Sequence, residues 1–160
     1  ITEANLGDGI FPAPDYRAAG GRYGIGTDSN VLISAAEELR SLEYAQRLSL
    51  RARNVLSASA GQSTGRALFD AALAGGSQAL GVTAFGLREG TPADLVSLNA
   101  ADPVLAGRRG NSVLDSWIFA ADRVVDCVWR QGAKLVVDGR HAGRELAARR
   151  YKEALGRIVN

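Results

Sequence analysis

The sequence predicts an α/β protein with two parts that differ in secondary structure. In the first part, a short apolar and glycine-rich run at 22–26 is followed by two segments with helical periodicity, an order typical of parallel α/β architecture. In the second part, short alternating runs between turn residues predict antiparallel strands with flanking helices. The 160-residue chain is 46% hydrophobic and 22% charged, which is the composition of a protein that buries a core.

The amino-terminal segment is predicted to be a loop. Residues 1–14 combine prolines with the turn-prone "NLGDG", which favours irregular structure. A short helix over 15–19 then ends at Gly20 and Gly21 and leads into a strand over 22–26. One strand cannot form a parallel sheet by itself, so we expect its neighbours to lie outside this sequence.

Two longer segments have the periodicity of helices. The segment 34–54 begins with Ser34 and Glu37 at the spacing of a capping box. After the break at "SASAGQ", the segment 63–81 restarts as a helix rich in small residues, which permit close packing. Its expected cap is Ser63 or Thr64, and the residues expected to face inward are Leu68, Ala72 and Leu80.

The second part of the chain changes to a strand period. A strand over 94–98 and two strands over 124–130 and 134–137, joined by a tight turn at 131–132, are predicted from alternation and turn residues. A helix over 111–121 lies between them. The last segment, from Gly143 onward, is predicted to be an amphipathic helix with a largely cationic polar face.

Charge and cysteine content restrict the possible partners. Nineteen Lys and Arg against seventeen Asp and Glu leave a net charge of +2, which is too small to imply nucleic-acid binding. No run approaches the roughly 20 apolar residues that cross a bilayer. The single Cys127 excludes an internal disulfide, which fits a reducing compartment. We therefore expect a cytoplasmic protein with no nucleic-acid or membrane partner.

Asp28 directly follows the predicted strand, in "GRYGIGTDSN". In parallel barrels, polar residues at the carboxyl ends of strands line the active site. A carboxylate at such a position can bind a divalent metal and accept a proton from the metal's water ligand. The alternative is that Asp28 caps a helix that begins near Asn30 or Val31. From the residues alone, both interpretations stay open.

Few other groups could take part in chemistry. The only histidine, His141, and the only cysteine, Cys127, are far from Asp28 in the sequence, and we expect a surface histidine and an inert buried thiol. The loop "ANLGDG" offers Asn5 and Asp8, although such loops also form turns for local reasons. A zinc site normally has three or four protein ligands, so either this chain binds no metal or the other ligands lie outside it.

Six segments carry a resemblance that covers essentially the whole chain. They are "TEANLGDGIFP", "AAGGRYGIGTDSNVLISAAEELRSLEYAQRL", "STGRALFDAALAGGSQALG", "ADLVSL", "LDSWIFA" and "VDCVWRQGAKLVVDGRH". Together they resemble the carboxyl-terminal part of the formimidoylglutamate deiminases, a family of the amidohydrolase superfamily. The "GTDSN" motif alone indicates only the superfamily, whereas "AAEELRSLEYAQRL" and "DSWIFA" with "VDCVWRQG" indicate the narrower family.

The resemblance implies a fold that this chain fills only in part. Members of the family are (β/α)8 barrels with a small β-sandwich built from both ends of the chain. The resemblance therefore implies the last part of the barrel at 1–82, the carboxyl-terminal share of the sandwich at 83–142 and a carboxyl-terminal helix at 143–160. A whole barrel takes roughly 250 residues, so we expect this sequence to be a carboxyl-terminal portion of a larger enzyme.

The resemblance also implies roles for residues near Asp28. Asp28 matches the family aspartate that ligates one divalent metal ion, usually zinc, and shuttles a proton from the attacking water. Asn5 and Ser29 are expected to bind substrate. The family's metal-binding histidines, catalytic histidine and acid-base glutamate have no match here, so the other metal ligands are expected outside this chain. The chain alone is expected to be inactive, and its expected partners are the rest of the same polypeptide and a second copy in a homodimer.

The reaction that the resemblance implies is hydrolysis of the small molecule N-formimidoyl-L-glutamate to N-formyl-L-glutamate and ammonia, in histidine degradation. Two alternatives remain open at this stage. One is another amidohydrolase, of the guanine deaminase or chlorohydrolase type. The other is a noncatalytic interaction domain.

Overall fold

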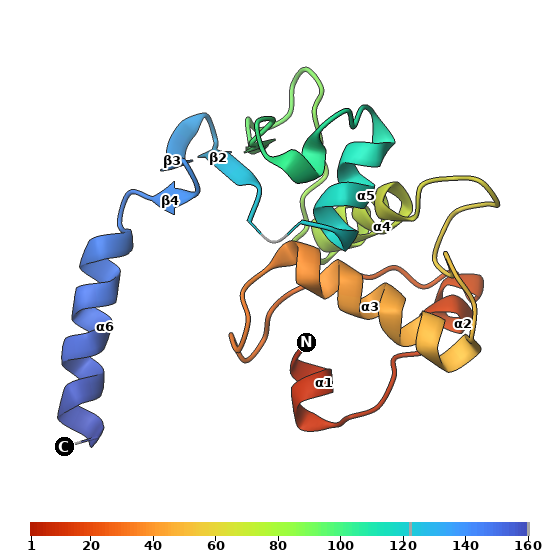
Figure 1. Cartoon of the computed structure of the whole chain (residues 1–160), viewed down its shortest axis with the longest axis horizontal. Helices are drawn as coiled ribbons and strands as arrows, with labels where there is room; N and C mark the ends of the chain where they lie inside the picture. The colour runs from red at the N-terminus through yellow and green to blue at the C-terminus, as the bar shows by residue number, and fades with distance from the viewer. Residues whose placement is uncertain (122, 160) are drawn as a thin grey trace. The chain divides into compact units, whose positions relative to one another are not determined.

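The computed structural model describes residues 1–121 and 123–159 (Figure 1). Residues 122 and 160, which fall within the predicted parts 83–142 and 143–160, lie outside the described residues. The elements in chain order are α1 (Thr2–Leu6), α2 (Ala13–Ala18), α3 (Ala35–Leu50), α4 (Thr64–Ala79), β1 (Leu95–Leu98), the 3-10 turn η1 (Pro103–Leu105), α5 (Asn111–Phe119), β2 (Val125–Arg130), β3 (Ala133–Val137), β4 (Arg140–His141) and α6 (Arg144–Val159).

The contacts of the chain define two units. The first contains Ile1–Phe85 and Ala101–Asp122, and the second contains Gly86–Ala100 and Arg123–Asn160. Helix α5 falls within the predicted part 83–142, but it packs against α3 and α4 in the first unit. The predicted bounds divide this chain into its shares of a barrel and a sandwich, and this division stays a prediction.

Helices α3, α4 and α5 build the core of the first unit, and Figure 1 shows them next to one another. The buried side chains of this core are Ala13, Leu39, Leu56, Leu68, Ala72 and Ile118. Four partly buried side chains pack against it, namely Tyr23, Leu42, Trp117 and Phe119. Burial of these apolar groups is the main stabilising contribution to the unit.

Both long helices of the first unit begin at the caps that the sequence predicts. The Ser34 hydroxyl accepts a hydrogen bond from the Glu37 N–H at 3.3 Å, and the Ser63 hydroxyl accepts one from the Arg66 N–H at 2.9 Å. Each cap satisfies one of the backbone donors that a helix start leaves unpaired. The expectation for Leu80 is wrong: this side chain is 81% exposed, because α4 ends at Ala79.

The amino-terminal loop and the first predicted strand also differ from expectation. Within residues 1–14, α1 forms one helical turn that ends at Gly7, which is left-handed with φ 78°, so the glycine of "NLGDG" ends a helix instead of extending a loop. The segment 22–26 has no strand partner among the described residues. A strand needs a hydrogen-bonded neighbour, and this unit provides none. The predicted strand is therefore wrong for this structure.

The small residues of α4 allow a close backbone contact with the segment 22–26. A Cβ atom placed on Gly75 would lie 2.0 Å from the Tyr23 carbonyl oxygen, which is far inside van der Waals distance. At the neighbouring Gly76, an added Cβ would lie 3.9 Å from the Gly24 Cα, an ordinary contact. The close packing expected from small residues is present, and at Gly75 the partner is the non-helical segment 22–26.

We predict opposite effects for alanine at these two glycines. Gly75→Ala forces the Tyr23 backbone away from α4 and should cost about 2–3 kcal/mol of stability, as overpacking does in a dense core. Gly76→Ala should be neutral or stabilising by up to about 1 kcal/mol, because alanine is the better helix former. Thermal unfolding of the two variants measures the difference. Equal melting temperatures would contradict the packing that we describe.

The second unit contains an antiparallel sheet in the order β1-β2-β3-β4. The three predicted strands are confirmed, with ends that shift by one residue. The turn between β2 and β3 has positive φ at both central residues, 50° at Gln131 and 82° at Gly132, which matches the twist of the flanking strands. The Asp94 carboxylate accepts hydrogen bonds from Arg130 and from the Gln131 N–H, and the Arg130 hydrogen bond lowers the pKa of Asp94.

The predicted carboxyl-terminal helix is confirmed as α6, but none of its residues is buried. Its large apolar side chains are exposed: Leu146, Tyr151, Leu155, Ile158 and Val159. Among the described residues, no helix has both the length and the apolar character to cross a bilayer.

Candidate active site

Asp28 lies in a tight turn at 27–30 that is closed by a backbone hydrogen bond from the Asn30 N–H to the Thr27 carbonyl, at 3.0 Å. The Thr27 hydroxyl donates to the Asn30 side-chain oxygen at 3.1 Å. Both Asp28 and Asn30 have left-handed backbones, with φ of 41° and 57°. Asn and Asp adopt this conformation more readily than other side chains that carry a Cβ, which explains why they occupy these positions.

The Asp28 side chain is exposed, and among the described residues its carboxylate has no hydrogen bond or ion pair. The alternative role as a helix cap is wrong. The next helix, α3, begins at Ala35, and its capping side chain is Ser34. Asp28 thus presents two oxygen atoms that have no structural function in the described protein, and a carboxylate in this state can ligate a metal ion or accept a proton.

Thr2 connects α1 to both sides of Asp28. Its Oγ1 lies 3.2 Å from the Thr27 carbonyl oxygen, 2.8 Å from the Ser29 hydroxyl and 3.2 Å from the Ser29 backbone nitrogen. Thr2 is only 6% exposed. Our sequence reasoning missed this residue, because a contact between positions 25 or more residues apart leaves no periodic or motif signal.

The structure brings the two predicted substrate-binding residues to the same region. Asn5 lies on α1, three residues after Thr2, and this spacing places both on one side of the helix. Ser29 follows Asp28 directly, and its hydroxyl contacts Thr2. The side chains of Asn5 and Ser29 are exposed. The roles of Asn5 and Ser29 in substrate binding stay predictions.

A hollow of about 310 Å³ lies beside the segment that leads into the Asp28 turn. Its walls include Tyr23 and Gly26 of that segment, Phe11, and Glu38 and Leu42 of α3. Two buried oxygen atoms in these walls, the Tyr23 hydroxyl and the Glu38 Oε1, have no hydrogen-bond partner in the described protein. Burial raises the pKa of Tyr23. Buried polar atoms normally have partners, so this wall is suited to further polar contacts.

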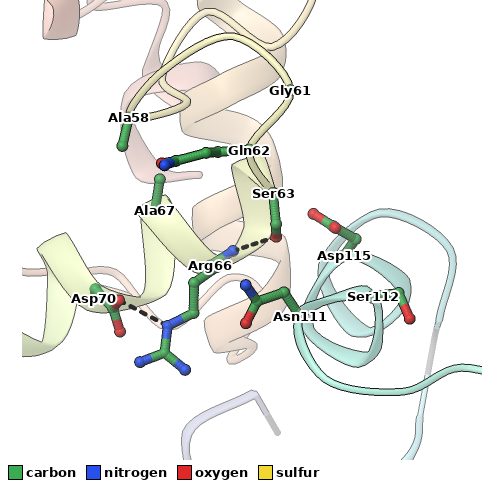
Figure 2. A pocket seen from close by; sticks show the side chains of 10 residues that line it. All are labelled: Ala58, Gly61, Gln62, Ser63, Arg66, Ala67, Asp70, Asn111, Ser112 and Asp115. Atoms are coloured by element: carbon green, nitrogen blue, oxygen red, sulfur yellow. Dashed lines mark hydrogen bonds and ion pairs between the residues drawn. The ribbon is translucent and has the colours of Figure 1, made fainter.

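A larger hollow of about 640 Å³ lies between the 58–63 loop, α4 and α5 (Figure 2). Figure 2 shows that Arg66 reaches Asp70 along α4, and the ion pair between them is 2.7 Å long. On the α5 side, Asp115 accepts the Gly65 N–H at 2.7 Å. The charged groups of this hollow stabilise helices, and none of the predicted site residues lines it.

His141 and Cys127 have structural roles in the second unit. The His141 Nδ1 accepts a hydrogen bond from the Gly143 N–H at 2.9 Å, and the histidine is exposed. Cys127 is a free, buried thiol. Among residues 1–121 and 123–159, no three His, Cys, Asp or Glu side chains are grouped so that they could hold a metal ion.

Comparison with known proteins gives strong similarities over nearly the whole chain, although no model of a protein family matches it. It is 52% identical over 160 residues to formimidoylglutamate deiminase of Pseudomonas aeruginosa, a match that covers 99% of this chain and 35% of the relative. It is 53% identical to an amidohydrolase from Brucella melitensis of known crystal structure, with a TM-score of 0.92 and the same two coverages of 99% and 35%.

A more distant structure has the same fold. The atrazine chlorohydrolase from Arthrobacter aurescens TC1, crystallised in complex with zinc, aligns with a TM-score of 0.70 at 24% identity and covers 88% of this chain and 30% of its own length. The chain thus spans about a third of the length of the relatives that it matches. The predicted resemblance is confirmed: the chain is similar along nearly all its length to a carboxyl-terminal portion of formimidoylglutamate deiminase, and its fold is that of amidohydrolase structures.

Proposed function

We propose that this chain is the carboxyl-terminal portion of a metal-dependent deiminase that hydrolyses N-formimidoyl-L-glutamate to N-formyl-L-glutamate and ammonia. The observation that carries the proposal is the 52% identity to a formimidoylglutamate deiminase over 99% of the chain. The exposed Asp28 carboxylate without a structural partner supports it. We use "complete polypeptide" for a protein that contains this chain together with the rest of such a barrel.

The residues present can supply one ligand of a metal site. The Asp28 carboxylate is exposed and has no protein partner, and carboxylate oxygen is an accepted zinc ligand. The zinc in the crystal structure of the distant chlorohydrolase supports the choice of metal. When bound, a divalent metal acts as a Lewis acid and lowers the pKa of water to about 7. Because no three His, Cys, Asp or Glu side chains of the described residues are grouped so that they could hold a metal ion, we propose that the remaining ligands lie outside this chain.

Asp28 has two oxygen atoms, so it can ligate metal through one and hold the attacking water through the other. In the proposed reaction, Asp28 accepts a proton from that water as the water oxygen bonds to the formimidoyl carbon. Asp28 then gives this proton to the terminal nitrogen, and the second proton of the water passes from the new hydroxyl to the same nitrogen by way of Asp28. The bond between this nitrogen and the carbon breaks as the C=O bond of the formyl group forms, and ammonia leaves. This is general acid-base catalysis by one carboxylate, and no redox partner is needed.

The Ser29 hydroxyl can accept a hydrogen bond from substrate. If the Thr2 hydroxyl donates to the Thr27 carbonyl, the Ser29 hydroxyl must donate to Thr2, and its own lone pairs then remain free. A free acceptor beside Asp28 suits the N–H groups of a formimidoyl substrate. Asn5, on the same side of α1 as Thr2, offers an amide that can donate to a substrate carboxylate.

The rest of the polypeptide is the proposed partner of the first unit. The segment 22–26 has no strand neighbour here, and the adjoining hollow contains two unpaired buried oxygens on Tyr23 and Glu38. Barrel strands on either side of this segment would pair its backbone and cover the hollow. We further propose that the complete polypeptide forms a homodimer and lies in the cytoplasm. The exposed apolar side chains of α6 are available for the contact between the two copies.

The reaction is tested by measuring ammonia release from N-formimidoyl-L-glutamate and from guanine with the same preparation of the complete polypeptide. We expect rapid release from the first substrate and background release from the second. Preference for guanine would assign the chain to another branch of the amidohydrolases. No release from either, in a preparation that contains zinc, would favour the noncatalytic interaction domain.

A further inference from the structure

We propose that Thr2 is a positioning residue that holds the Asp28 carboxylate in its reactive orientation. The inference rests on the proposed role of Asp28 and adds a residue on a different element, 26 positions earlier in the chain. Thr2 does not touch the Asp28 side chain in any described hydrogen bond. It acts through the two peptide units that flank Asp28.

The hydrogen bonds of the Thr2 hydroxyl use all of its donor and acceptor sites. A threonine hydroxyl has one donor and two acceptor sites. The donor points to the Thr27 carbonyl at 3.2 Å. One acceptor site receives the Ser29 N–H at 3.2 Å. The Ser29 hydroxyl oxygen lies 2.8 Å away and, because the single Thr2 hydroxyl hydrogen goes to the Thr27 carbonyl, Ser29 is the donor of that contact. One side chain therefore fixes the residue before Asp28 and the residue after it.

The backbone of Asp28 needs such support. Its φ of 41° lies in the left-handed region, which is unfavourable for residues with a Cβ. The turn hydrogen bond from Asn30 to Thr27 closes the loop but leaves the Ser29 N–H without a backbone acceptor among the described residues. Thr2 supplies that acceptor, and at 6% exposure it is shielded from competing water.

The direction in which the Asp28 carboxylate points depends on this backbone. A change in φ or ψ at Asp28 rotates its Cα–Cβ bond, and a metal ligand tolerates only small displacements. Groups that orient metal ligands from outside the coordination shell typically contribute 10–100-fold to metal affinity or activity. We assign Thr2 to this class.

The experiment compares three variants of the complete polypeptide. Thr2→Val removes the hydroxyl and keeps the shape, Thr2→Ser keeps the hydroxyl, and Thr64→Val removes a hydroxyl from a similarly buried threonine at the start of α4. We expect Thr2→Val to weaken zinc binding and to lower kcat by about 10–100-fold with little change in KM. Thr2→Ser and Thr64→Val should retain the parent values.

Two further readouts separate positioning from stability. Amide hydrogen exchange at Ser29 should accelerate in Thr2→Val, because its acceptor is lost, while the melting temperature changes little. Parent-like zinc affinity and kcat in folded Thr2→Val would overturn the proposal. If Thr2→Val does not fold, Thr2→Ala removes the same hydroxyl with a smaller side chain, and failure of both variants to fold would assign Thr2 to stability alone and also overturn it.

A failure of the Thr2 proposal can be distinguished from a failure of the proposed function. Asp28→Asn is measured in parallel, and normal turnover in that variant would refute the role of Asp28 itself. In that case Thr2→Val would still accelerate exchange at Ser29, without an effect on zinc affinity. If the role of Asp28 holds and Thr2→Val is catalytically normal, only the positioning proposal fails.

Discussion

Asp28→Asn in the complete polypeptide is expected to lower the turnover of N-formimidoyl-L-glutamate by roughly 10²–10⁴-fold, the range that positioned acid-base groups contribute. Asparagine has nearly the same shape but cannot accept the proton of the attacking water, and its amide is a poorer metal ligand. Stability should change little, because the Asp28 carboxylate is exposed and has no described partner in the fold. Initial rates of ammonia release at saturating substrate measure the effect.

The matched control is Asp15→Asn. Asp15 is an exposed aspartate in the first turn of α2, so its replacement removes the same charge from the same unit without touching the Asp28 turn. We expect turnover within about twofold of the parent, since surface substitutions of this kind change stability by no more than about 0.5 kcal/mol. Comparable rates for Asp28→Asn and the parent would exclude Asp28 from the chemistry.

Glu43→Ala is expected to destabilise the protein by about 3–5 kcal/mol, the cost of breaking a buried charged network from one side. Glu43 is fully buried. Its Oε1 accepts from the Arg47 Nε at 2.7 Å and from the Val55 N–H at 2.9 Å, and its Oε2 accepts from the Leu56 N–H at 2.9 Å. Removal of the carboxylate leaves one cation and two backbone donors without their partner.

A second ion pair in the same unit provides the control. Arg66 and Asp70 have the same i,i+4 spacing and the same 2.7 Å separation as the Glu43 pair, but both side chains are about half exposed. Asp70→Ala should therefore cost no more than about 1 kcal/mol. Chemical denaturation followed by circular dichroism measures both variants, and equal losses would show that burial does not set the difference.

Local signals in the sequence were sufficient for much of the fold. The starts of α3 and α4 were predictable because Ser34 and Ser63 cap helices through residues only three positions away. The β2-β3 hairpin was predictable for the same reason, since Gln131 and Gly132 form a turn of defined geometry. These interactions depend on short stretches of chain.

Features that depend on distant residues were not predictable in the same way. The segment 22–26 has the composition of a buried strand, but strand pairing needs a neighbour that the described chain does not contain. The burial of Glu43 depends on backbone donors 12 and 13 residues later. A charged residue in a helix pattern is normally placed on the exposed face, so periodicity alone misassigns it.

The same distinction between local and distant interactions applies to the candidate site. Asp28 was identifiable because it follows a glycine-rich apolar run, and the resemblance to a known family gave it a role. The sequence does not show that Asp28 caps no helix, because this depends on the start of α3 at Ala35. The contact of Thr2 with Thr27 and Ser29 joins two elements and has no signature in either one.

The most direct test of the account is the zinc affinity of the complete polypeptide with and without the Asp28 carboxylate. Zinc dissociation constants of the parent, Asp28→Asn and Asp15→Asn are measured by competition with a chromophoric chelator, and turnover is measured on the same samples. The account predicts that Asp28→Asn weakens zinc binding by at least the roughly 10–100-fold that loss of an orienting partner costs, together with loss of turnover. Parent-like zinc affinity and parent-like ammonia release in Asp28→Asn would contradict it.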